Sequence, residues 1–147
     1  MNPTEREQRL AAVIDRYRYW PFTWGEHDCV LFAARCIDAQ CDSTFELRLR
    51  REFDYHNGIS AYRAIKAGGG FERLLSRYLG PAMPPTQAEV GDVVLAQGTA
   101  GRFDNQQIIG ICDEEKFIAP DELCLSWVPM KFATHVWKCP HPDTGAR

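Results

Sequence analysis

The sequence contains neither a long apolar run nor a concentrated block of charge. No segment approaches the ~18 consecutive apolar residues that a membrane span needs, and residues 1–9 are too polar for a signal peptide. The net charge is only -3, so the non-specific phosphate binding of nucleic-acid proteins has no basis here. We therefore expect no membrane insertion, no nucleic-acid partner and synthesis in the cytoplasm.

The six cysteines include no Cys-x-x-Cys pair, which removes the commonest signal of a zinc or iron–sulfur site. The spacing of Cys36 and Cys41 and the run Cys139-Pro140-His141 match no well-attested ligand pattern either. We predict no metal and no cofactor, and no disulfide at synthesis in a reducing cytoplasm. A metal-carrying protein stays open as an alternative. Its ligands would come from Cys36, Cys41, Cys112, Cys124 and Cys139.

What the sequence does contain is enough apolar material for one core, with 45% hydrophobic residues among 147. We predict a single domain over residues 1–147, with 140–147 as a flexible tail. Apolar residues at helical spacing between 10 and 17 predict an amphipathic first helix. Residues 28–40 combine helix formers, apolar side chains on nearly every face and Asp28 as a cap, which predicts a central buried helix.

Further helices and then a sheet are predicted along the chain. Residues 60–66 and 71–78 read as two short helices, because the three glycines between them cannot sustain one. After the prolines at 81–85, short β-branched and apolar runs predict strands near 93–95, 108–111, 117–118, 123–128 and 134–138. The predicted fold class is α+β, with a mainly helical first half whose central helix packs on a small antiparallel sheet.

The most informative segment is Trp24-Gly25-Glu26-His27-Asp28-Cys29, which places a thiol in the first turn of the central helix, directly after its cap. The unpaired N–H groups and the positive dipole end of that turn favour thiolate, the nucleophilic form of cysteine. Asp28 opposes this by like-charge repulsion. Cys29 is therefore a candidate nucleophile, and a small buried thiol is the alternative interpretation.

Several short motifs in a fixed order carry a family resemblance over roughly residues 20–137. They are Trp24-Gly25-x-His27-Asp28-Cys29-x-x-Phe32-Ala33-Ala34, Gly68-Gly69-Gly70-Phe71, Gly91-Asp92-Val93-Val94-Leu95, and Gly110-Ile111-Cys112 running into Phe117-Ile118-Ala119-Pro120. Together they resemble an uncharacterised family from phage and prophage tail loci that is related to NlpC-type papain-like cysteine peptidases. The resemblance implies a papain-like fold, other phage tail proteins as partners, and a place in the virion tail after assembly in the host cytoplasm.

The resemblance also shows where this chain departs from active enzymes. In NlpC-type peptidases a histidine that begins the strand after the Gly-Asp motif is the general base, and a second polar group lies on the next strand. The matching positions here are Ile108 and Ala119, and neither accepts a proton. His135, on the last predicted strand, and His27, two residues before the thiol, are the candidates that remain for the base.

These observations favour a structural protein of the tail tip or tail assembly, with a degenerate NlpC-like fold, over an enzyme. An active thiol hydrolase stays open as an alternative, in which Cys29 attacks an amide of peptidoglycan. The metal-carrying tail protein is the second alternative. The aromatic residues that precede the central helix are either an interface for a partner or packing for their own loop. They are Tyr19, Trp20, Phe22 and Trp24.

Overall fold

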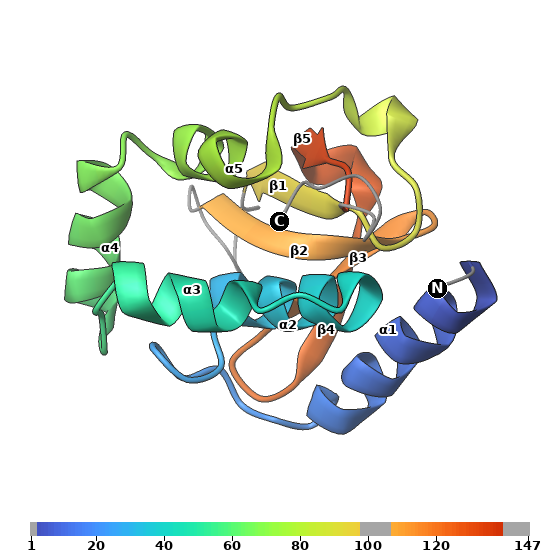
Figure 1. Cartoon of the computed structure of the whole chain (residues 1–147), viewed down its shortest axis with the longest axis horizontal. Coiled ribbons are helices and arrows are strands. Elements are labelled where there is room, and N and C mark those ends of the chain that lie inside the picture. The colour runs from blue at the N-terminus through green and yellow to red at the C-terminus, as the bar shows by residue number, and fades with distance from the viewer. Residues whose placement is uncertain (1–2, 98–106, 140–147) are drawn as a thin grey trace.

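The computed structural model describes residues 3–97 and 107–139, and these form an α+β architecture (Figure 1). In the described residues the helices come first along the chain and an antiparallel sheet follows. The helices are α1 (Pro3–Tyr17), α2 (Cys29–Cys41), α3 (Phe45–Glu52), α4 (Gly58–Ala67) and α5 (Phe71–Leu79). Two short 3-10 turns, η1 (Pro85–Gln87) and η2 (Met130–Phe132), lie in the second half.

The sheet has the strand order β4-β3-β2-β1-β5, so the last strand returns to the far side of the first. Each neighbouring pair is antiparallel. The strands are β1 (Val93–Gln97), β2 (Gln107–Asp113), β3 (Lys116–Pro120), β4 (Leu125–Pro129) and β5 (Ala133–Trp137). This order places β2 in the centre, and α2 packs against β2 and β3.

Alternation of side chains along the strands divides the core into two layers. The layer between the sheet and the helices contains Val93, Leu95, Ile109, Ile111 and Trp137, together with Cys29 and Phe32 of α2. The opposite face of the sheet is covered by apolar side chains near the two 3-10 turns, namely Met83, Ala88, Met130 and Phe132. Figure 1 shows α1, α2 and α3 on the helical side of the sheet, where both α1 and α3 contact α2.

The predicted α+β class is confirmed, and so is the first-turn position of the thiol, since α2 begins at Cys29 and buries it toward the sheet. All five strands lie within two residues of their predicted positions. Helix α3 was not predicted, because its sequence is strongly charged and only Leu49 is buried. The predicted tail at 140–147 falls outside the described residues.

Candidate functional site

Asp28 caps α2 with a buried carboxyl group. Its backbone is extended, as is usual for a cap, and its Oδ1 accepts the N–H of Leu31 at 2.9 Å. Its Oδ2 accepts the N–H of Gly25 at 3.0 Å and the hydroxyl of Tyr55 at 2.8 Å. Because the side chain is withdrawn from solvent, these three donors replace the water that it loses on folding. The cap thus fixes the loop that leads to the thiol.

Cys29 follows the cap directly, and its sulfur lies against β2. Burial, and then the charge of Asp28, raise the pKa of the Cys29 thiol to about 12. Backbone hydrogen bonds of Ile109, Cys29 itself and Val30 lower the pKa but offset only part of this rise. Two of these residues open α2, where the N–H groups have no intrahelical partner. With 5% of its surface exposed, the thiol is protonated at neutral pH and shielded from solvent.

The β2 position that the motif assigned to the catalytic histidine does not face Cys29. The side chain of Ile108 belongs to the apolar cluster on the opposite face of the sheet. Ile109 and, by alternation, Gln107 share the face that α2 covers. The position that the motif indicates, Ile108, is therefore one residue away from Ile109, whose side chain lies on the same side of the sheet as the thiol. Ile109 is as apolar as Ile108, so this shift of one residue supplies no base.

His135 lies on β5, and the structure does not bring it to Cys29. Strand β1 separates β5 from β2, so two strand spacings, about 10 Å in all, lie between His135 and the Ile109 backbone that contacts the thiol. The imidazole has other partners. Its Nε2 lies 3.3 Å from Glu72, and its Nδ1 lies 2.9 Å from the hydroxyl of Thr134.

His27 lies two residues before Cys29 but points into an aromatic cluster. Its ring stacks on Tyr17 with centroids 5.3 Å apart, and Nη1 of Arg35 lies 3.1 Å from its Nδ1. A guanidinium has only donors, so Nδ1 accepts and Nε2 carries the hydrogen. Burial, and then the charge of Arg35, lower the pKa of His27 to about 4. The one nitrogen able to accept a proton is therefore already bonded to Arg35.

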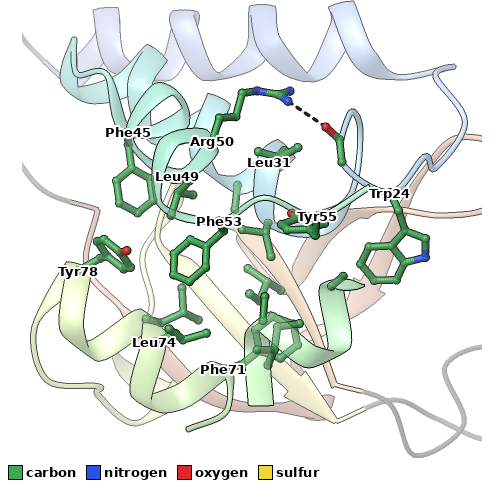
Figure 2. A pocket seen from close by; sticks show the side chains of 18 of the residues that line it. Trp24, Leu31, Phe45, Leu49, Arg50, Phe53, Tyr55, Phe71, Leu74 and Tyr78 are labelled. Atoms are coloured by element: carbon green, nitrogen blue, oxygen red, sulfur yellow. Dashed lines mark hydrogen bonds between the residues drawn. The ribbon is translucent and has the colours of Figure 1, made fainter. Parts of the chain in front are cut away.

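A cavity of about 150 Å³ lies beside the first turns of α2, between α2, the helices α3 to α5 and the sheet (Figure 2). Aromatic and aliphatic side chains form most of its wall, including Phe45, Leu49, Phe53, Phe71, Leu74 and Tyr78. Arg50 lies at its polar end, where it donates a hydrogen bond of 2.9 Å to the carbonyl oxygen of Gly25, drawn as the dashed line in Figure 2.

The cavity approaches the thiol without exposing it. Val30 and Ile109, whose backbones bond to the sulfur, line the cavity with their own atoms. Trp24 and Tyr55 of the neighbouring loops also line it. Among the described residues that form the wall, Cys29 does not appear. A substrate in the cavity would thus meet apolar side chains rather than the sulfur.

The remaining cysteines form no metal cluster in the part of the chain that the structure describes. No group of three or more His, Cys, Asp or Glu side chains there is arranged to hold a metal ion. The metal-carrying alternative therefore has no support from residues 3–97 and 107–139. No helix in these same ranges is both long and apolar enough to cross a membrane.

The comparison with protein families gives a match over nearly the whole chain. Residues 2–139 match a family described as Domain of unknown function (DUF6950). The chain belongs to DUF6950. A comparison with curated proteins found no match. The DUF6950 match includes the cap, the Cys29 helix and all five described strands, so the site described above lies within the family's domain.

Three contributors to this DUF6950 site were not found from the sequence. The hydroxyl of Tyr55 bonds to Asp28, which lies 27 residues earlier in the chain. The guanidinium of Arg35, on α2, bonds to Nδ1 of His27. Ile109 faces the cysteine helix, whereas the family motif indicates its neighbour Ile108, which faces the other way. Neither Tyr55 nor Arg35 lies in a recognisable motif, because each acts through a tertiary contact. The alternation of β2 was visible, but which of its faces meets α2 was not.

Proposed function

We propose that this DUF6950 domain is a structural protein of a phage tail tip or tail assembly, built on an NlpC-type papain-like fold with a degenerate catalytic site. The observation that carries the proposal is the setting of Cys29. The thiol is buried, its pKa is raised to about 12, and backbone groups rather than a base bond to its sulfur. A nucleophilic cysteine needs a partner that takes its proton and returns it to the leaving group.

The papain-like part of the proposal has support from the order of the elements. A helix that begins with the cysteine precedes an antiparallel sheet, and the Gly91-Asp92 turn leads into the first strand. This is the order that the resemblance to NlpC-type peptidases predicts. The assignment to the virion tail, with assembly in the host cytoplasm, rests on the sequence motifs. Other tail proteins are the partners that this assignment implies.

An exposed aromatic surface is the contact that we assign to a tail partner. Tyr19 is 80% exposed and Trp20 is 47% exposed, whereas Phe22 and Trp24 are half-buried against each other. The backbone at both ends of the loop between β3 and β4 bonds beside this turn, since the N–H of Phe22 donates to Asp121 and the N–H of Leu125 donates to the carbonyl oxygen of Arg18. The loop adds Leu123, which is 77% exposed. We call Tyr19, Trp20 and Leu123 the Tyr19 patch.

The test is made in the phage or prophage that encodes the chain. Cys29→Ala should leave particle assembly and infectivity nearly intact. Tyr19→Ser combined with Trp20→Ser should prevent incorporation of the protein into tails, since tyrosine and tryptophan are frequent interface anchors. Tyr62→Ser is the matched control, because Tyr62 is 64% exposed on α4 and lies outside the patch. Its particles should resemble the wild type.

An active thiol hydrolase of peptidoglycan is the second candidate, and one observation favours it. The backbone N–H groups of Cys29 and Val30 lie in the first turn of α2 beside the thiol, and donors at a helix start can stabilise a thiolate or a developing oxyanion. Release of muropeptides from purified cell walls decides between the two. The structural proposal would be refuted by two results together. The wild type would cleave cell walls while Cys29→Ala does not, and Cys29→Ala particles would assemble normally but fail to infect.

A further inference from the structure

Two cysteines from distant parts of the chain have their sulfurs in contact. Cys41 is the last residue of α2, and Cys139 follows the end of β5. Their Sγ atoms lie 3.3 Å apart, although 98 positions separate them in the sequence. This is about 1.3 Å longer than a disulfide bond of ~2.05 Å. Both residues are buried in the core between helices and sheet.

The contact is held in place by the turn that precedes β1. On one side, the Nε2 of Gln40, the neighbour of Cys41, donates to the carbonyl oxygen of Gly91 at 3.2 Å. On the other side, the N–H of Cys139 donates to Oδ1 of the buried Asp92 at 3.0 Å. Consecutive residues of one turn therefore fix the backbones beside both thiols.

Asp92 is itself fixed from several directions, which limits the movement of Cys139. Its Oδ2 accepts the N–H of Glu89 at 2.9 Å and lies 3.0 Å from Nζ of Lys138. Gly91 has φ of +96°, and a Cβ at this position would lie 2.0 Å from the Gln40 side chain, so this close approach requires glycine. The two sulfurs face each other because of this arrangement rather than through flexible side chains alone.

We propose that Cys41 and Cys139 form an intramolecular disulfide that joins the end of α2 to the segment after β5. The oxidant is a small-molecule disulfide such as oxidised glutathione. The Cys139 thiolate attacks one glutathione sulfur, which breaks the glutathione S–S bond, forms a mixed disulfide and releases one glutathione thiolate. The Cys41 thiolate then attacks the Cys139 sulfur and releases the second. Two electrons pass from the protein to glutathione, and the two protons of the protein thiols end on the two released glutathione thiolates.

The native surroundings set when this reaction occurs. The hydrogen bond with Cys41, and then burial, raise the pKa of the Cys139 thiol, while Arg6 of α1 acts in the opposite direction. Thiolate is therefore scarce in the folded chain, and we expect the bond to form during folding or local opening. Once formed, the buried disulfide should resist small reductants in the native protein.

The test refolds the purified wild-type protein from urea in oxidised and in reduced glutathione mixtures, then unfolds it again in urea with N-ethylmaleimide, so that the buried thiols are trapped as well. Peptide mass mapping of the oxidised sample should give one linked peptide pair containing Cys41 and Cys139, with the other four cysteines alkylated. The oxidised protein should melt roughly 5–10 °C above the reduced protein, because the bond closes a long loop. Mapping of the wild type needs no variant and so does not depend on whether a variant folds.

Two variants sharpen the result. Cys41→Ala should give no linked pair and a melting temperature that is the same in both redox mixtures. Cys124→Ala is the matched control, because Cys124 is the partly exposed thiol while the other five are buried. It should form the same bond as the wild type. Alkylation of all six thiols after equilibration with oxidised glutathione, or linkage of Cys41 to any other cysteine, would overturn the proposal.

Discussion

The hydroxyl of Tyr55 donates a hydrogen bond of 2.8 Å to Oδ2 of Asp28, and this contact attaches the loop after α3 to the cap of the cysteine helix. Burial, and then the charge of Asp28, raise the pKa of Tyr55 well above its ordinary value near 10. The hydroxyl therefore stays a donor throughout the physiological range. A residue that follows α3 in the chain, Tyr55, therefore helps to hold the start of α2.

Tyr55→Phe should lower the free energy of unfolding by about 1.5–3 kcal/mol, as expected for a buried hydrogen bond to a charged acceptor. The ring and its packing beside Trp24 are retained, so the loss reports the hydroxyl. Urea unfolding followed by circular dichroism measures it. Tyr62→Phe removes the hydroxyl of an exposed tyrosine and should change stability by less than about 0.5 kcal/mol. Equal effects of the two variants would contradict the proposed role of Tyr55.

The thiol of Cys29 should be unreactive in the folded protein. At pH 7.5, iodoacetamide should modify the partly exposed Cys124 first and leave Cys29 untouched, because Cys29 is buried and its pKa is raised to about 12. Mass mapping of the native protein measures this, and the urea-unfolded protein, in which both are modified, is the control. Preferential alkylation of Cys29 in the native state would show an activated thiolate instead.

The same shift predicts how stability depends on alkaline pH. The pKa of Cys29 is raised from about 9 to about 12, so above pH 9 the unfolded chain loses this proton while the folded protein keeps it. Stability is lost as pH rises through this window, by about 1.4 kcal/mol for each pH unit. Wild-type stability should fall more steeply than that of Cys29→Ala between pH 9 and 11. Parallel curves would mean that Cys29 ionises freely in the fold.

Local signals explain which parts of this structure were predictable. The cap at Asp28 and the apolar residues behind it are neighbours in the chain, so the cysteine helix and its first residue followed from sequence. The strands followed from β-branched runs bounded by proline and glycine. The position of His135 did not, because nothing local shows that β5 pairs with the far side of β1.

Other features depend on tertiary packing and were not accessible. A shift of one residue exchanges the two faces of a strand, so the choice between Ile108 and Ile109 required the docking of α2 on the sheet. The Cys41–Cys139 contact spans most of the chain and has no spacing signature. The cavity arises where four helices meet the sheet and has no counterpart in any single segment.

Arg35 connects three helices and should be costly to remove. Its guanidinium lies 3.1 Å from Glu46 of α3 and sits 4.8 Å from the ring centroid of Tyr17 of α1, in addition to its bond to His27. Arg35→Ala should lower the free energy of unfolding by about 2–3 kcal/mol. Arg35→Lys should lower it by less than Arg35→Ala does, because lysine keeps the charge but lacks the planar guanidinium. Urea unfolding measures both.

A second readout separates this network from simple packing. The charge of Arg35 is one of the causes that lower the pKa of His27, so Arg35→Ala should raise that pKa, as followed by NMR titration of the imidazole. Arg51→Ala, which removes an exposed arginine of α3, is the control for both measurements and should change neither. An unchanged His27 titration in Arg35→Ala would show that the two side chains do not interact in solution.

His27 should make the protein sensitive to mild acid. Its pKa is lowered from 6.5 to about 4, so between these values the unfolded chain binds a proton that the folded protein excludes. Because the unfolded state binds more protons, stability is lost as pH falls from about 6.5 to about 4, by about 2–3 kcal/mol in total. His27→Phe removes the titrating group and keeps an aromatic ring beside Tyr17. Its free energy of unfolding should fall less than that of the wild type between pH 7 and pH 4.5.

The exposed His56 supplies the control, since His56→Gln should leave the wild-type pH dependence unchanged. If His27→Phe and the wild type lose stability equally over this range, the imidazole is protonated in the folded state, and its role as a neutral acceptor for Arg35 is excluded.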